Sequence, residues 1–153
     1  MKHIGKNSLS GFIKILLMMC MAAAVIVVGT LPWVVNWYLN ILGTDLSYAR
    51  TILLIALYPC GILAFFVLNE LRRIIGTLTD KNPFVIRNVK SLRRIGLMLV
   101  LMFLVFIFKI VTLNTLMTMI CSFILMLASM FCFVLADVFN QAVIYKQDID
   151  LTI

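Results

Sequence analysis

Four long apolar runs limit what this chain can fold into. They cover residues 12–35, 48–71, 95–113 and 115–139. A helix needs about 20 apolar residues to cross the hydrocarbon core of a bilayer. Lipid offers no partner for backbone polar groups, so spanning segments are helices or strands of a closed barrel, and runs this long favour helices. We therefore predict an all-α fold, an integral membrane antiparallel four-helix bundle.

The composition supports this interpretation. Of the 153 residues, 64% are hydrophobic and 12% are charged. Soluble domains average about 45–50% apolar and about 25% charged residues. A soluble core of this length could not cover so much apolar surface. We expect a single four-helix domain over residues 1–153, with the lipid bilayer as its main partner.

The placement of the basic residues predicts an orientation. Of the 13 Lys and Arg residues, Arg50 and Lys109 lie on one side of the expected spans and the other eleven lie on the opposite side. Basic residues gather on the cytoplasmic side of membrane proteins. This places both termini, the loop 72–94 and the tail 140–153 in the cytoplasm. The expected location is the cell membrane.

The cytoplasmic loop is the first candidate site. Asn82 before Pro83 is typical of a helix start, with Asn as the cap and Pro at the first position. An amphipathic helix is expected from there into the third span, and its basic side chains are Arg87, Lys90, Arg93 and Arg94. This helix could anchor the protein on anionic lipid or dock a cytoplasmic protein. Direct nucleic-acid binding is not expected, because no recognition-helix motif or base-stacking aromatic residue accompanies the charges.

Charged residues at the membrane edges are the second candidates. Glu70 and Asp137 end the second and fourth spans, and ionisable groups in a membrane are suspected functional sites. Arginines are available nearby, so one interpretation is a set of structural salt bridges. The alternative is a proton- or cation-coupling site. Lys109, near the outer end of the third span, is expected to extend toward the interface, with a role as substrate counter-ion as the alternative.

The last residues alternate between polar and apolar side chains, which is strand-like. The tail at 148–153 could add to the sheet edge of a partner, lie against the basic loop or remain frayed. Catalysis has little support, since the chain has no HExxH, GxSxG or phosphate-loop motif. Its four cysteines lie inside apolar runs without metal-site spacing. No enzyme activity, cofactor or metal is expected.

Two segments resemble a known family. These are residues 80–84 (DKNPF) with 88–96 (NVKSLRRIG), and residues 135–139 (LADVF) through 148–153 (DIDLTI). They are similar to small bacterial four-helix membrane proteins of the YoaS-like domain-of-unknown-function family, which are often encoded beside helix-turn-helix regulators. The family-marking residues would be Asn82, Pro83, Phe84, Asn88, Leu92, Arg93, Ile95 and Gly96. The resemblance implies a membrane protein that partners such a regulator, by association only.

We therefore predict a non-enzymatic bacterial membrane protein that binds and regulates a cytoplasmic partner, such as a small helix-turn-helix regulator. The alternative is an oligomeric small-solute transporter or channel subunit. Four helices are few for a solute path, so that function would need a homo-oligomer. The middles of the spans are almost purely apolar, which counts against the alternative.

Overall fold

The described chain is made of four helices. The computed structural model describes residues 4–43, 47–79 and 84–152. The helices are α1 (Ile4–Leu42), α2 (Ser47–Thr79), α3 (Ile86–Thr112) and α4 (Leu116–Leu151). Each is long and apolar enough to cross a membrane. The predictions of an all-helical fold and of four helices able to span a membrane are confirmed for the described residues.

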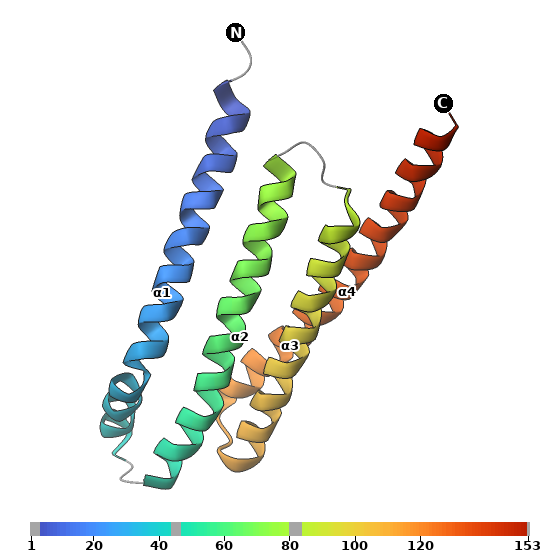
Figure 1. Cartoon of the computed structure of the whole chain (residues 1–153). Helices are drawn as coiled ribbons and strands as arrows, with labels where there is room; N and C mark the ends of the chain where they lie inside the picture. The colour runs from blue at the N-terminus through green and yellow to red at the C-terminus, as the bar shows by residue number, and fades with distance from the viewer. Residues whose placement is uncertain (1–3, 44–46, 80–83, 153) are drawn as a thin grey trace.

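The helices contact one another in chain order. α1 packs on α2, α2 on α3 and α3 on α4, and no other helix pair is in backbone contact within the described ranges. The start of α1, the end of α2, the start of α3 and the end of α4 lie at one end of the molecule (Figure 1). The end of α1, the start of α2 and the α3–α4 connection lie at the opposite end, which we call the hairpin end. The backbone of α4 lies beyond this contact range from α1 and α2, although side chains of α2 and α4 share one core.

The predicted loop 72–94 is mostly helical. α2 continues to Thr79 and α3 begins at Ile86, so helices occupy most of the residues between the second and third apolar runs. The physical reason is a core that extends beyond the apolar runs. Ile74 is buried with Val89 and Val143, so residues counted as loop are held in helices by packing.

The start of α3 also differs from the prediction. The helix begins at Ile86, and Val85 occupies the cap position in an extended conformation, with φ −124° and ψ 138°. Asn82 and Pro83, the predicted cap and first residue, lie outside the described residues. The segment in which an amphipathic helix was expected forms the first part of α3, which runs without interruption into the apolar segment. Phe84, just before the cap, packs its ring 5.8 Å from that of Phe139 on α4.

The strand-like interpretation of the tail is wrong. α4 remains helical through Leu151, and Thr152 donates its backbone N–H to the carbonyl of Ile149. Val143 anchors this part of α4 in the same core as Ile74. Alternation over a few residues is weak evidence for a strand when a long helix already precedes it.

α1 bends near the hairpin end. Its last turns run in a different direction from the rest of the helix (Figure 1). Pro32 lies inside α1, and a proline within a helix removes one backbone donor and clashes with the preceding turn. Residues 34–42 are thereby turned across the hairpin end, where several of them line a cavity.

Candidate functional site

A buried carboxylate, Glu70, links α2 and α3 at the end of the molecule where α1 begins and α4 ends. Glu70 of α2 is only 6% exposed. Its Oε1 lies 3.3 Å from Nη1 of Arg73 and 3.2 Å from Nη1 of Arg94. Its Oε2 accepts a hydrogen bond of 2.8 Å from the Ser91 hydroxyl. One acid on α2 therefore holds a neighbour on its own helix and two residues on α3.

Asn88 forms a second polar contact between the same two helices. It is 1% exposed, and its Oδ1 lies 2.8 Å from the Thr77 hydroxyl on α2. That hydroxyl also lies 2.7 Å from the backbone carbonyl of Ile74. Every buried side-chain polar atom in the described part of the chain has a hydrogen-bond partner. Satisfied buried networks of this kind fix one relative position of two helices.

The second predicted acid has a different environment. Asp137 of α4 pairs with Arg93 of α3 at 3.2 Å, and their side chains are 70% and 57% exposed. Exposed ion pairs contribute about 0–1 kcal/mol. Both acids therefore form the predicted salt bridges, but only the carboxylate of Glu70 is buried. Neither Glu70 nor Asp137 forms an ion pair with Arg72.

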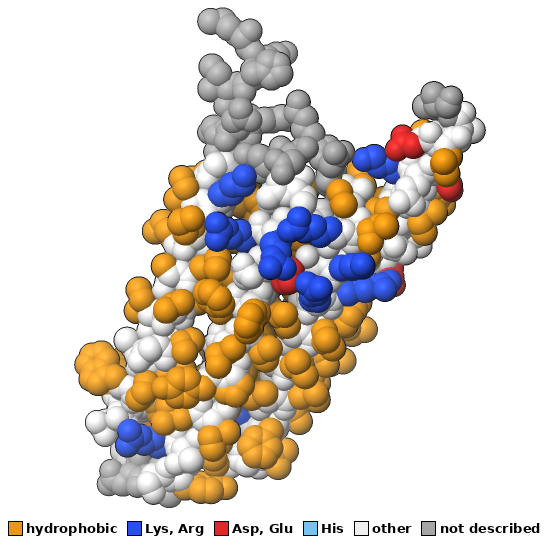
Figure 2. All heavy atoms as spheres, in the orientation of Figure 1, with side chains coloured by type: hydrophobic (Ala, Val, Ile, Leu, Met, Phe, Trp, Pro, Cys, Tyr) orange, Lys and Arg blue, Asp and Glu red, His pale blue; other side chains and the backbone are white. Residues whose placement is uncertain are grey.

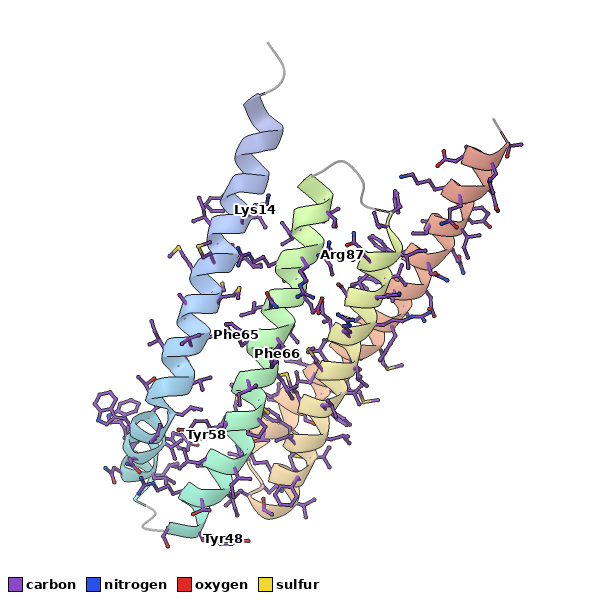
Figure 3. All side chains as sticks on the ribbon, viewed as in Figure 1. Lys14, Tyr48, Tyr58, Phe65, Phe66 and Arg87 are labelled. Carbon is purple, nitrogen blue, oxygen red and sulfur yellow. The ribbon has the colours of Figure 1, made fainter. Side chains whose placement is uncertain are left out.

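Exposed cations surround this network. They come from all four helices and form a surface that we call the basic end (Figure 2). Its members are Lys14, Arg72, Arg73, Arg87, Lys90, Arg93, Arg94 and Lys146. Lys14 on α1 and Arg87 on α3 mark two sides of it, while Tyr48 lies at the hairpin end (Figure 3).

The four predicted contact residues divide into two pairs. Arg93 forms an ion pair with Asp137, and Arg94 forms one with Glu70. Arg87 and Lys90 are exposed and take part in no recorded ion pair within the described chain. Sequence reasoning missed Ser91 and Thr77, which complete the network. The available signal for such residues was a short polar side chain on an otherwise apolar helix face. This signal does not identify the hydrogen-bond partner, because the partner lies on another helix.

The end of α4 is a further part of this region. α1 and α4 extend farther than α2 and α3 at the basic end and diverge from each other (Figure 1). With 36 residues, α4 is about 54 Å long at 1.5 Å per residue, against a hydrocarbon core of about 30 Å. The helix is therefore longer than one crossing requires, and the exposed side chains of its last turns include Ile144, Tyr145, Asp148, Ile149, Asp150 and Leu151.

The sequence was also compared with known proteins. A family model described as a protein of unknown function (DUF2975) matches residues 34–153. The chain belongs to this family. The match begins in the last turns of α1 and covers all of α2, α3 and α4, including the buried network and most of the basic end. No curated protein and no solved structure matches the chain.

The family assignment agrees with the resemblance only at the level of an uncharacterised family. It names no activity and no ligand. Within residues 4–43, 47–79 and 84–152, no three His, Cys, Asp or Glu side chains come close enough to hold a metal ion. What the geometry offers at this end is a rigid, positively charged surface next to a projecting helix.

Proposed function

We propose that this DUF2975 member is a non-enzymatic multi-pass protein of the bacterial cell membrane whose basic end binds and regulates a cytoplasmic protein. The observation that carries the proposal is the concentration of eight exposed cations at one end, against the single exposed cation Arg50 in the described part of the hairpin end. The bundle is antiparallel in this proposal. The positive-inside rule then assigns the basic end and both termini to the cytoplasm.

The surface suits a protein partner because it combines charge with apolar groups. Phe84, Val85 and Ile86 are exposed beside Arg87. The projecting turns of α4 add Tyr145 and other apolar side chains together with acids. Binding energy in interfaces comes mainly from buried aromatic and arginine side chains, and charges set partner choice. The resemblance points to a small helix-turn-helix regulator as the partner.

The alternative transporter function gains no support from the acids. An ion-coupling carboxylate would be expected away from arginine, but Glu70 contacts two arginines and Asp137 contacts one. Regulation through the cytoplasmic end therefore remains the proposal.

The orientation is tested by cysteine labelling in whole cells. In a cysteine-free background, Asn114→Cys at the hairpin end is expected to react with a membrane-impermeant maleimide, whereas Arg87→Cys at the basic end reacts only after the cells are opened. Both positions are exposed, so a difference reports the side of the membrane. The opposite labelling pattern would reject the cytoplasmic placement of the basic end.

Partner binding is tested by photo-crosslinking in native membranes. A photoreactive amino acid at Arg87 or Tyr145 is expected to capture a soluble protein, and the same probe at Arg50 is expected to capture none. Replacing Arg87 and Lys90 with Ser should reduce capture at Tyr145 at least about tenfold, because opposite charges steer association. Arg93 and Arg94 are left unchanged in this experiment, since they hold the ion pairs.

The matched control is Arg50→Ser, which removes an exposed cation from the hairpin end and should leave capture unchanged. If only lipid is captured at Arg87 and Tyr145, the basic end is a topology anchor and the proposed partner is ruled out.

A further inference from the structure

A cavity lies at the hairpin end, opposite the basic end. Its volume is about 570 Å³, and it is lined by residues of all four helices and by Leu113 and Thr115 of the α3–α4 connection. Small-molecule sites in proteins occupy about 300–1,000 Å³. Residues of α1 that follow Pro32 contribute to the cavity lining, and so do Met117, Thr118 and Cys121 of α4.

The wall of the cavity is apolar except at a few points. Twelve of its sixteen lining side chains are apolar, among them Trp37 of α1, Leu53 of α2 and Phe106 of α3. The polar exceptions are Tyr38, Lys109, Thr115 and Thr118. Sites with this lining bind ligands that are largely apolar and are oriented by a few polar contacts.

Lys109 is the one charged side chain in this wall. Its Nζ donates a hydrogen bond of 2.8 Å to the hydroxyl of Thr118, which is itself 3% exposed. An ammonium group has three donors, and this is the one side-chain contact recorded for it among the described residues. The described carboxylates Glu70, Asp137, Asp148 and Asp150 make no ion pair with it.

A positive charge in an apolar wall is costly unless an anion or other acceptor accompanies it. We propose that the cavity binds an amphiphile with one acyl chain and an anionic head group, with the head at Lys109 and the chain along the apolar wall. A small inorganic anion would leave most of the wall unfilled. A complete two-chain phospholipid exceeds the size of one small-ligand site. The sequence alone indicated a lysine near the end of a span, with a counter-ion role as the alternative, but it did not indicate the cavity.

The structure provides its own probe for binding. Trp37 lines the cavity and is 62% exposed, whereas Trp33 does not line it and is 75% exposed. In a Trp33→Phe background, chain-brominated palmitate is expected to quench the fluorescence of Trp37 in detergent micelles in a saturable way. Lys109→Gln should raise the half-saturating concentration about tenfold or more, because hydrogen bonds to charged groups are the strong ones. Lys109→Arg should keep it within a few-fold.

Arg50→Gln is the matched control, since it removes the other cation of this end without touching the cavity lining. It should bind as the parent does. Cys121 lines the cavity, and Cys121→Phe fills part of it while Lys109 is unchanged, so this variant should lose saturable quenching. Unaltered binding by either Lys109→Gln or Cys121→Phe would overturn the proposal.

The source of the amphiphile is distinguished by three brominated probes. Saturation by the fatty acid alone identifies a free single-chain acid, and saturation by phosphatidylglycerol alone identifies an anionic bilayer lipid that inserts one chain. Equal saturation by zwitterionic phosphatidylcholine would overturn the role of Lys109. None of these outcomes depends on whether the basic end binds a protein.

Discussion

Replacing Glu70 with Gln is expected to lower the free energy of unfolding by about 1–3 kcal/mol. Gln keeps the size of the side chain and can still accept from Ser91, but it carries no charge to hold the guanidinium groups of Arg73 and Arg94. Breaking a fully buried ion pair costs about 3–5 kcal/mol. The smaller range applies because the two arginines are 46% and 58% exposed and regain water.

Asp137→Asn is the matched control for this prediction. It also neutralises one acid that pairs with an arginine of α3, but both partners are exposed. We expect a change of about 0–1 kcal/mol. The measurement is unfolding by sodium dodecyl sulfate in mixed micelles, followed by tryptophan fluorescence. Equal losses for the two variants would show that burial of Glu70 does not determine the strength of the network.

Gly96→Leu is expected to destabilise the α3–α4 pair by about 1–3 kcal/mol, as overpacked sites do. Gly96 is buried on α3. A Cβ at this position would lie 3.1 Å from Cζ of Phe133 on α4, which is tighter than ordinary van der Waals contact. The rest of a leucine side chain would meet the ring directly, so the two helices must move apart or the ring must turn away.

The cause is tested by making room at the partner. Phe133→Ala removes the ring, so the double variant Gly96→Leu with Phe133→Ala should be less destabilised than the sum of the two single variants. Gly29→Leu on α1 is the control, because no atom lies within 4 Å of a Cβ built there. If Gly29→Leu is as harmful as Gly96→Leu, the effect does not come from the contact with Phe133.

Hydrophobicity was sufficient to predict the four spans, because the cost of placing polar groups in lipid acts on each residue by its own chemistry. The nearness of Glu70 and Asp137 to arginines could also be anticipated. All of these groups were expected at the same membrane edge, where opposite charges are drawn together. Which arginine pairs with which acid could not be anticipated. Glu70 contacts Arg94 and Asp137 contacts Arg93 because of how α2 and α4 face α3.

The helix ends could not be read from hydropathy. Residues 72–79 and 140–151 were assigned to a loop and a tail because they lie beyond the long apolar runs, yet they are helical. Packing explains this result: Ile74 and Val143 belong to a core with Val89 at the basic end. Such a core forms between residues far apart in the chain, so no local window contains its signal.

The apolar runs alone were sufficient to predict a helical chain with four segments able to cross a membrane, since that conclusion needs only the transfer of each side chain into lipid. The contacts between helices established the rest. They bury Glu70 while leaving Asp137 exposed, and they open a cavity in whose wall Lys109 lies. These features depend on distances between separate helices, which the order of residues within one helix does not contain.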